Sequence, residues 1–507
     1  MTFLEYLSNW KKYLSALSNT MIDDKLSIKY LRQIEYINKI EYGIFMDAKL
    51  FQTLKNTYDN NIVSASKKEN NVHINPIQEI YKKGSSVFNI IEKAINSKKL
   101  FCLMGPPGTG KTTAIAEIIL QTMKMNSKSK IAICSETHIA VDNAIEKLIY
   151  ECSRRKLNYS IMRYEEFKDE KDNLKYNVCY NDYIDHWKKY AVSSYDKEFC
   201  EKLFIEFEKN IENKKGNHKY ICDNASIIGI TCNQIGRFKI EELDEPYDLV
   251  IIDEVSKNTL PEILMPASFA KKLILVGDPN QLPPVFCRNE IETMNEIDVN
   301  LQERLIENSL VDRLFNNVDK ETMFGMLDTQ YRMEAKIGDI VSRFFYNGEL
   351  KNGTAYSDDE SIYWIDYHTN EKFPNNYGGE LYNPIEIDLI NNSIENLNAE
   401  ANTSIAIITP YKKQKSELTK KIKNNEKLKH LNIKIDTIDA FQGKEADIVY
   451  FSIVRNTGST RFFSNIKRLN VAISRTKKKL YMVGMSRYCK RASILNEIYN
   501  NSNILIS

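Results

Sequence analysis

The octapeptide GPPGTGKT, residues 105–112, constrains the fold of this 507-residue chain more strongly than any other segment. It fits the pattern G-x-x-x-x-G-K-[ST], follows the apolar run LFCLM and precedes the helical pattern TAIAEIILQTM. In such a strand–loop–helix unit, glycines let backbone N–H groups surround phosphate oxygens at the positive end of a helix. The segment therefore predicts an α/β nucleotide-binding domain, in which Lys111 contacts the β- and γ-phosphates and Thr112 holds Mg²⁺. The residues expected to contact the nucleotide are Gly105, Pro106, Pro107, Gly108, Thr109, Gly110, Lys111, Thr112 and Thr113.

Polar residues follow two further apolar runs. In YDLVIIDEVSK, Asp253 and Glu254 come directly after a strand pattern, and ligands of parallel α/β sheets bind at the carboxyl ends of strands. We expect Asp253 to hold Mg²⁺ and Glu254 to orient and deprotonate water, which favours hydrolysis over phosphoryl transfer to a bound acceptor. In KLILVGDPNQLPP, Gln281 can donate and accept hydrogen bonds, so it can sense a γ-phosphate and the attacking water.

Short apolar runs alternate with longer amphipathic stretches in two series, as in parallel sheets whose strands are separated by helices. This rhythm predicts a first α/β domain at residues 99–300 and a second at 301–507. Residues 1–98 favour a mostly helical N-terminal region. Residues from about 150 to 224 are charged and rich in Tyr, and indicate a helical insertion. The insertion is either a solvated excursion or a subdomain that faces nucleic acid.

The charge and cysteine patterns exclude several other classes. The 70 Lys and Arg nearly balance the 68 Asp and Glu, so a basic groove for nucleic acid has to be local. Nine scattered cysteines include no CxxC pair, which argues against a zinc or iron–sulfur site and favours reduced thiols. No apolar run reaches the length of a membrane-spanning helix. We expect a cytoplasmic protein, or a nuclear one in a eukaryote.

Six motifs in a fixed order resemble those of the superfamily 1B helicases, with the closest likeness to the up-frameshift and senataxin type. They are GPPGTGKT, DEVSK, GDPNQLPP, QYRM, DTIDAFQGKEADIVYFSIVRN and RLNVAISRTKKKLYMVG, and they span residues 100 to 485. The resemblance implies two RecA-like domains with parallel sheets, ATP hydrolysed in the cleft between them, and 5′→3′ movement along single-stranded RNA or DNA.

The resemblance also assigns roles to residues of the second domain. Arg332 of QYRM and Arg475 of RLNVAISR match arginines that stabilise charge on the transferred phosphoryl group. Tyr331 matches an aromatic residue that stacks on the base, and Glu445 of QGKE matches a ribose contact. These assignments imply that residues from both domains act on one ATP.

Polar residues near strand ends match the family's contacts with the sugar-phosphate backbone. Hydroxyl and backbone N–H groups at such positions grip a strand without reading its bases. For each of these residues, a capping or turn role is the alternative. The residues are Thr137, His138, Thr231, Tyr411 and Thr437.

Three departures limit the resemblance. Gln78 lies some ten residues further from the phosphate loop than the family's adenine-binding Gln, so a Gln on a helix surface is its alternative. Lys257 stands where the family commonly has Gln. The chain also shows no Cys/His-rich module before the helicase motifs, and residues 1–98 look too helical for the family's β-barrel.

Protein partners would bind the N-terminal region or the insertion, and we expect a monomer.

Three functions compete. The first is an ATP-dependent helicase or translocase, and the second is an ATP-gated clamp or scaffold that hydrolyses ATP without unwinding. A P-loop kinase is the third, but it does not explain arginines from a second domain. The sequence leaves the choice of RNA or DNA open, because backbone contacts serve both.

Overall fold

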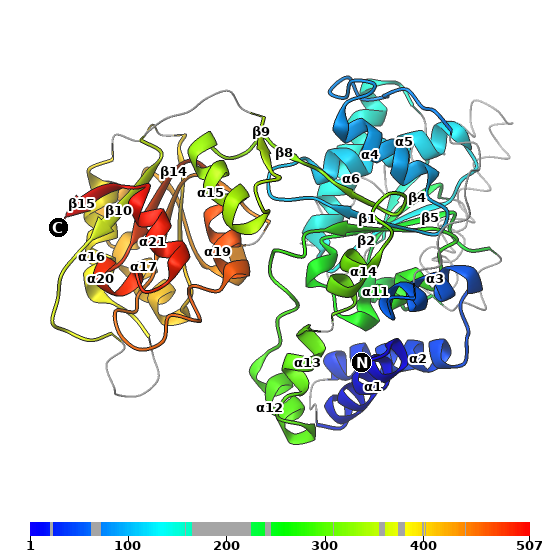
Figure 1. Cartoon of the computed structure of the whole chain (residues 1–507), viewed down its shortest axis with the longest axis horizontal. Coiled ribbons are helices and arrows are strands. Elements are labelled where there is room, and N and C mark those ends of the chain that lie inside the picture. Colours follow the sequence, from blue (N-terminus) through cyan, green and yellow to red (C-terminus); the bar gives the residue numbers. More distant parts are fainter. Residues whose placement is uncertain are drawn as a thin grey trace, which may run out of the picture. The chain divides into compact units, whose positions relative to one another are not determined.

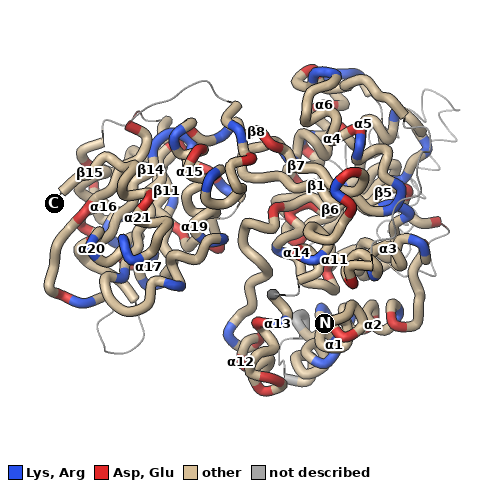
Figure 2. The backbone as a smooth tube through the Cα atoms, in the orientation of Figure 1, with Lys and Arg blue, Asp and Glu red and all other residues tan. Residues whose placement is uncertain are grey.

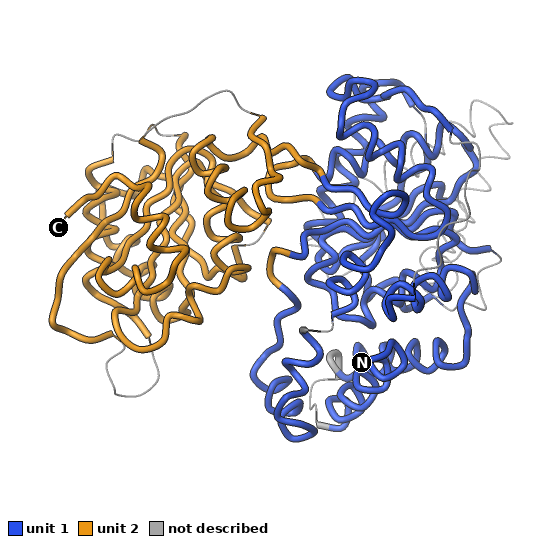
Figure 3. Tube along the Cα trace, in the orientation of Figure 1, with its two compact units in different colours: residues 1–104, 111–279, 283–326 blue, residues 105–110, 280–282, 327–507 orange. Residues whose placement is uncertain are grey.

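The computed structural model divides the chain into two compact units (Figure 3). It describes residues 1–20, 24–61, 72–157, 159–164, 225–238, 245–307, 309–353, 360–373, 381–397, 400, 402–441 and 443–506. Unit 1 comprises Met1–Met104, Lys111–Pro279 and Pro283–Met326. Unit 2 comprises Leu327–Ser507 together with two short segments, Gly105–Gly110 and Asn280–Leu282. Two turns that the sequence assigns to nucleotide binding are thus grouped with unit 2.

Unit 1 is built on a seven-stranded sheet in which every pair of neighbouring strands is parallel. The strand order is β3-β4-β2-β5-β6-β1-β7. The strands β1, β2, β4, β5 and β6 are fully or almost fully buried and rich in Ile, Leu and Val, as expected when helices cover both faces. Their bounds are β1 Leu100–Met104, β2 Ile131–Ser135, β3 Ile161–Arg163, β4 Ile227–Thr231, β5 Leu249–Asp253, β6 Leu273–Gly277 and β7 Phe324–Met326.

Helices cover both faces of this sheet (Figure 1). One face carries α4 (Ser86–Asn96), α5 (Lys111–Met125) and α6 (His138–Arg154), which pack side by side. The other face carries α3 (Ala48–Tyr58), α11 (Leu260–Ala267) and α14 (Leu310–Asn317). The remaining helices of unit 1 are α1 Phe3–Thr20, α2 Asp24–Glu41, α10 Cys232–Ile235, the 3-10 turn η2 Val255–Lys257, α12 Arg288–Ile297 and α13 Leu301–Glu307.

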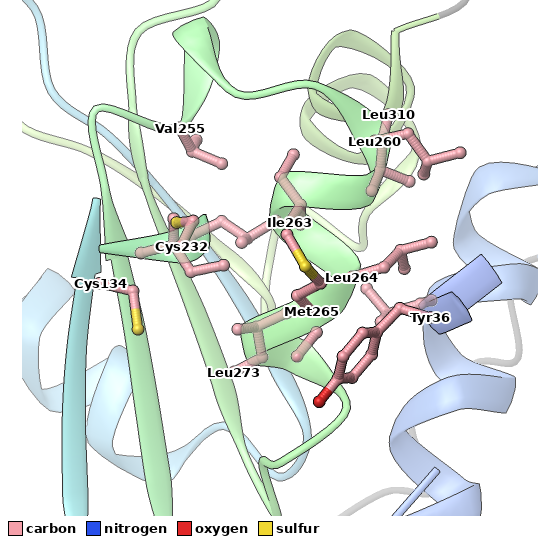
Figure 4. Packing of buried hydrophobic residues seen from close by; sticks show 14 of the residues in the cluster. Tyr36, Cys134, Cys232, Val255, Leu260, Ile263, Leu264, Met265, Leu273 and Leu310 are labelled. Atoms are coloured by element: carbon pink, nitrogen blue, oxygen red, sulfur yellow. The ribbon is translucent and has the colours of Figure 1, made fainter. Parts of the chain in front are cut away.

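The N-terminal helices extend the core of unit 1. Figure 4 shows α11 lying between strand residues such as Cys134 and Leu273 and the ring of Tyr36 on α2. Burial of these apolar side chains stabilises the arrangement by about 25 cal/mol per Å². Lys29 adds an ion pair to the buried Glu262, with 3.0 Å between Nζ and Oε1.

Unit 2 has a second parallel sheet, in the order β12-β11-β13-β14-β10-β15. On one face α16 and α17 pack together against a cluster that includes Ile390, Leu418 and Tyr450. Helices α15 and α19 pack on each other, and α19 contacts β13 and β14. The strands are β10 Ile362–Asp366, β11 Ser404–Thr409, β12 Asn432–Thr437, β13 Ala446–Ser452, β14 Thr476–Val483 and β15 Asn503–Ile506, and the short pair β8 Thr329–Gln330 and β9 Lys351–Asn352 lies apart. The helices are α15 Ala335–Phe345, α16 Pro384–Glu395, α17 Lys412–Lys423, η3 Glu426–Leu428, α18 Ile438–Phe441, α19 Ile466–Ile473, α20 Ser486–Cys489 and α21 Ser493–Asn500.

The predicted fold class, two α/β parts with parallel sheets and a helical N-terminal region, is confirmed. Unit 1 continues to Met326, whereas the sequence suggested a domain boundary at 300/301. In the proposed insertion, β3 pairs with β4, and residues 165–224 lie outside the described residues. Among the helices that the structure describes, none is long and apolar enough to cross a membrane.

Candidate nucleotide and nucleic-acid site

The predicted site residues of unit 1 share the carboxyl edge of its sheet. Ser135 at the end of β2 is paired with Thr231 on one side and with Asp253 on the other. Met104 at the end of β1 is paired with Gly277 at the end of β6. Because all these strands run in the same direction, the segments that follow them emerge at one edge, where parallel sheets bind ligands.

The phosphate loop has the backbone conformation that its glycines permit. Gly108 and Gly110 have φ values of +74° and +80°, in the left-handed region that disfavours a side chain. The Thr109 hydroxyl donates to the carbonyl oxygen of Pro106 at 2.8 Å, which closes the turn. Helix α5 then starts at Lys111, so its first N–H groups face the loop and can bind phosphate oxygens.

Asp253 is buried at the end of β5 and held in place by backbone contacts. Its carbonyl oxygen accepts a hydrogen bond from the Ser135 hydroxyl at 3.0 Å, and its Oδ1 accepts one from the Glu254 N–H at 2.8 Å. Burial and the neighbouring Glu254 carboxylate raise the pKa of Asp253 to about 6, while Lys111 and Lys257 oppose this shift. Lys111 and Asp253 thus interact electrostatically, as a phosphate-binding lysine and a metal-binding carboxylate would.

Glu254 has an unusual backbone. Its φ of +52° and ψ of +36° lie in the left-handed helical region, which costs a non-glycine residue free energy and occurs often at functional sites. Its Oε2 forms an ion pair with Nζ of Lys257 at 3.0 Å. The sequence identified Lys257 only as a departure from the family, and this ion pair with the predicted base could not be foreseen.

Gln78 is buried beside the start of α5 and does not lie on a helix surface. Its Nε2 donates to the carbonyl oxygen of Thr113 at 2.8 Å, and its backbone N–H donates to Glu117 at 2.9 Å. Its Oε1 is buried and has no hydrogen-bond partner among the described residues. A free amide oxygen next to the phosphate loop can accept a hydrogen bond from an exocyclic amine, so these residues fit an adenine nucleotide.

Within unit 2, QYRM contacts the phosphate loop. The Tyr331 N–H donates to the carbonyl oxygen of Gly108 at 2.9 Å, and a Cβ at Gly108 would lie 2.6 Å from Cβ of Arg332. Gly108 therefore requires glycine for its φ angle and for this approach. The Tyr331 ring is 60% exposed and packs over Gly353, which leaves a face of it free for stacking.

Glu445, the predicted ribose contact, lies between two cations. Its Oε2 is 2.6 Å from Nε of Arg332, and its Oε1 is 2.6 Å from Nζ of Lys477. Burial acts to raise the pKa of Glu445, but Lys477 and Arg332 outweigh it and hold the pKa below its ordinary value. The Arg332 guanidinium also donates to the carbonyl oxygen of Ser474 at 3.2 Å. No sequence signal indicated that Lys477 would share this carboxylate.

Arg475 is buried and directed at Gln281. Its Nη2 lies 3.3 Å from Oε1 of Gln281, and its Nε donates to the carbonyl oxygen of Val471 at 3.0 Å. A guanidinium carries a positive charge and five N–H donors in a planar fork, so it suits a phosphate oxygen. The second predicted arginine and the predicted γ-phosphate sensor are therefore brought together in unit 2.

The predicted strand contacts of unit 1 differ in accessibility. Thr137 and His138 are exposed at the start of α6, where the Thr137 hydroxyl accepts a hydrogen bond from Ala140 at 3.3 Å. His138 Nδ1 lies 3.0 Å from Nη2 of Arg163. The Thr231 side chain is buried and forms a capping box with Gln234, so its hydroxyl has a structural role in this conformation.

The predicted strand contacts of unit 2 follow neighbouring strands. Thr409 at the end of β11 pairs with Thr437 at the end of β12, so Tyr411 and Thr437 lie at the same edge of the sheet. The Tyr411 ring stacks on Phe462, with centroids 5.5 Å apart. The Arg455 guanidinium lies 5.8 Å from the centre of the Tyr411 ring. Phe462 was missed because it belongs to none of the six motifs, and Arg455 was missed because its motif, DTIDAFQGKEADIVYFSIVRN, was used only for Thr437 and Glu445.

Together, the fold and this set of residues define a phosphate-loop nucleotide-binding protein with two parallel α/β sheets. Two AAA domain families match the chain, one at residues 85–178 and 188–289 and the other at residues 306–487. The chain belongs to the up-frameshift/senataxin type of superfamily 1 helicases.

The chain is similar to several curated proteins. It is 30% identical to DNA polymerase alpha-associated DNA helicase A of Saccharomyces cerevisiae over 454 residues, 78% of this chain and 63% of that protein. It is 28% identical to an uncharacterized ATP-dependent helicase of Methanocaldococcus jannaschii over 80% of this chain and 68% of that protein. With 63% coverage, the chain spans less than two thirds of the length of the S. cerevisiae protein. A solved arterivirus nonstructural protein 10 helicase with DNA gives a TM-score of 0.38 at 14% identity, covering 82% of this chain and 66% of that chain.

Proposed function

We propose that this protein is an ATP-dependent helicase or translocase that moves along single-stranded RNA or DNA. One observation carries the proposal. Unit 2 groups the phosphate-loop segment and the turn that carries Gln281 with both predicted arginines. The Tyr331 N–H, beside Arg332, donates to the Gly108 carbonyl oxygen, and Nη2 of Arg475 lies 3.3 Å from Oε1 of Gln281. A simple nucleotide-binding domain has no need of such arginines, whereas a motor uses them to couple hydrolysis to movement.

The residues at the edge of the unit 1 sheet would bind ATP and Mg²⁺. Lys111 and the N–H groups of the loop would bind the phosphates, Thr112 and Asp253 would hold the metal ion, and Gln78 would accept a hydrogen bond from the adenine amine. Bound Mg²⁺ would neutralise charge on the phosphate oxygens. Glu254 would take the proton of the attacking water.

Arg332, Arg475 and Gln281 would act on the transferred phosphoryl group, and Tyr331 would stack on the base. The Arg332–Glu445 ion pair implies a second role for Glu445. Its carboxylate holds the Arg332 guanidinium and would also contact the ribose. We further propose the domain limits 1–98, 99–300 and 301–507, a monomeric protein and 5′→3′ movement.

For the strand, Thr137, His138, Tyr411 and Thr437 are the proposed backbone contacts, and Thr231 would contribute only after its capping hydrogen bonds rearrange. Protein partners would bind through the N-terminal region or through the insertion at about residues 150–224. The relatives named above are helicases, and the S. cerevisiae one is named as a DNA helicase. The cytoplasm or nucleus is the proposed location.

An ATP-gated clamp is the competing function, because strand separation requires a wedge that the motifs do not define. The test combines ATP hydrolysis with displacement of a labelled strand from a partial duplex. A helicase displaces the strand only when ATP is hydrolysed. Hydrolysis that single strands stimulate, without displacement, identifies a clamp instead.

A further inference from the structure

A pocket of about 500 Å³ opens in unit 2, away from the nucleotide residues described above. Its volume falls in the range of small-ligand sites and suffices for a nucleotide unit rather than for a lone ion. The lining contains no carboxylate, and its eight residues are His368, Thr369, Asn370, Asn456, Met485, Arg487, Tyr488 and Arg491.

The cationic residues of this pocket have no acidic partner. Neither Arg487 nor Arg491 forms a side-chain hydrogen bond or an ion pair with any residue that the structure describes, although Arg491 lies 5.7 Å from the centre of the Tyr488 ring. By contrast, Arg343 on α15 pairs with Glu497 at 2.7 Å. Exposed guanidinium groups that converge on a pocket without a carboxylate attract an anion, and phosphate oxygens match their donor geometry. Arg487 is the basic residue of α20, which Figure 2 labels on a backbone tube with Lys and Arg in blue.

Hydrogen bonds fix the walls of the pocket. Asp366 at the end of β10 accepts hydrogen bonds from the N–H and the hydroxyl of Ser486, which sets the start of α20. Asn456 binds the backbone of the facing segment, donating to the Glu371 carbonyl oxygen and accepting from the Phe373 N–H, both at 2.8 Å. The pocket is therefore formed before a ligand binds, so little ordering cost accompanies binding.

The pocket is connected to a predicted strand contact by one loop. The Tyr488 hydroxyl donates to the carbonyl oxygen of Thr457 at 3.0 Å, in the segment that follows β13. The same segment carries Arg455, whose guanidinium lies 5.8 Å from the ring of Tyr411 and whose buried Nε has no hydrogen-bond partner among the described residues. A single strand that passes Tyr411 along the carboxyl edge of this sheet can thus reach the pocket.

We propose that the pocket binds a backbone phosphate of the single strand through Arg487 and Arg491, and so extends the footprint of unit 2 beyond Tyr411. This inference rests on the proposed function. Tyr488 is buried and its hydroxyl is engaged, so its ring is not available for stacking, and the proposed contacts are those of the two guanidinium groups with a phosphate. Binding there is therefore independent of base sequence. A free nucleotide carries the same phosphate chemistry, so the experiment must distinguish the two sources.

The experiment measures the affinity of the full chain for fluorescent single strands of increasing length, across a range of salt concentrations. Arg487→Ala and Arg491→Ala should each weaken binding roughly tenfold for long strands and leave short strands unaffected. Each should also reduce the slope of log K against log salt by about 0.7, the value for one lost phosphate contact on a single strand. Lys490→Ala is the matched control, because it removes a neighbouring charge that faces the Tyr499 ring and not the pocket.

Three outcomes decide the matter. Arginine variants that bind long strands as Lys490→Ala does overturn the proposal, provided that their ATP turnover without a strand shows intact folding. The mononucleotide measurement uses the Lys111→Ala background. If the arginine substitutions abolish binding of a fluorescent mononucleotide there and leave strand affinity unchanged, the pocket binds a free nucleotide and the proposal is overturned. A wild-type chain that binds no strand contradicts the proposed function, and the mononucleotide arm then tests the pocket separately.

Discussion

The Lys257 ammonium pairs with the Glu254 carboxylate, with 3.0 Å between Nζ and Oε2. Both side chains are partly buried, so solvent screens the pair less than it screens one at the surface. The pair restrains the carboxylate that we propose as the base. Its cation, Lys257, stands where the family that the sequence resembles commonly has Gln. The ion pair thus acts on the residue that we propose as the catalytic base.

Lys257→Gln should therefore speed ATP hydrolysis in the absence of a strand. Without the cation, the Glu254 carboxylate loses one restraint on taking the proton of water, and we expect kcat to rise roughly two- to fivefold with KM little changed. Steady-state turnover measures this effect. Lys271→Gln, which breaks the Lys271–Asp248 ion pair of 3.0 Å elsewhere in unit 1, is the control. Equal turnover in the two variants would show that the Lys257 pair has no part in hydrolysis.

Gly108→Ala should slow hydrolysis roughly a hundredfold through a local clash. The added Cβ meets Cβ of Arg332 at 2.6 Å, and displacing a group that acts on the phosphate by about 1 Å costs roughly a hundredfold in rate. Gly84→Ala separates the clash from the backbone strain, because Gly84 has a similar φ of +80° and nothing within 4 Å of its added Cβ. Gly84→Ala should lose about 1–2 kcal/mol of stability and keep full activity. Normal turnover in Gly108→Ala would refute the close approach of Arg332.

Arg332→Ala and Arg475→Ala should each lower kcat by about a thousandfold while nucleotide affinity remains nearly intact. The reason is that these guanidinium groups stabilise charge that develops only during phosphoryl transfer. Binding of a fluorescent nucleotide and single-turnover hydrolysis separate the two effects. Arg343→Ala serves as the control, since Arg343 forms an exposed ion pair with Glu497. Loss of binding in parallel with kcat would make the two arginines ground-state contacts.

Glu386 gives unit 2 a stability that depends on pH. Burial raises the pKa of Glu386 to about 8, although hydrogen bonds from the Ser452 hydroxyl and the Val454 N–H oppose the shift. The folded state therefore retains a proton that the unfolded chain releases at lower pH. This contribution is complete below the ordinary pKa of Glu and is lost as the pH rises to about 8.

After correction for the intrinsic pH dependence of exchange, hydrogen exchange of the β13 amides should show weaker protection as the pH rises from about 5 to 8. Glu386→Gln should flatten this trend. Glu395→Gln is the control that should leave the trend unchanged, because Asn425 and Lys427 hold the pKa of Glu395 below its ordinary value, so Glu395 does not titrate between about pH 5 and 8. An unchanged trend in Glu386→Gln would mean that Glu386 is ionised in the folded protein.

The sequence predicted those features that short motifs encode. The phosphate loop, Asp253 after β5 and Gln281 after β6 follow from strand patterns and from the rule that ligands bind at carboxyl ends. Gln78 could not be placed with certainty, because its contact with Thr113 joins segments 35 residues apart that no periodicity relates.

Other features depend on tertiary packing. The Thr231 hydroxyl is taken up by a capping box, which the sequence allowed only as an alternative. The pocket of Arg487 and Arg491 draws its walls from segments near residues 368, 456 and 487. Asn456 ends the motif DTIDAFQGKEADIVYFSIVRN, but the segments near residues 368 and 487 belong to no motif, and only the order of β13, β14 and β10 in the sheet brings the three together.

Displacement of a labelled strand is the most direct test of helicase activity, with the wild type and Glu254→Gln compared in the presence of ATP. We expect the wild type to displace the strand with ATP and to fail with a non-hydrolysable analogue. Glu254→Gln should bind both ATP and the single strand and displace nothing, and Lys111→Ala should lack turnover as well. Strand-stimulated ATP hydrolysis by the wild type with no displacement, or normal hydrolysis by Glu254→Gln, would contradict this expectation.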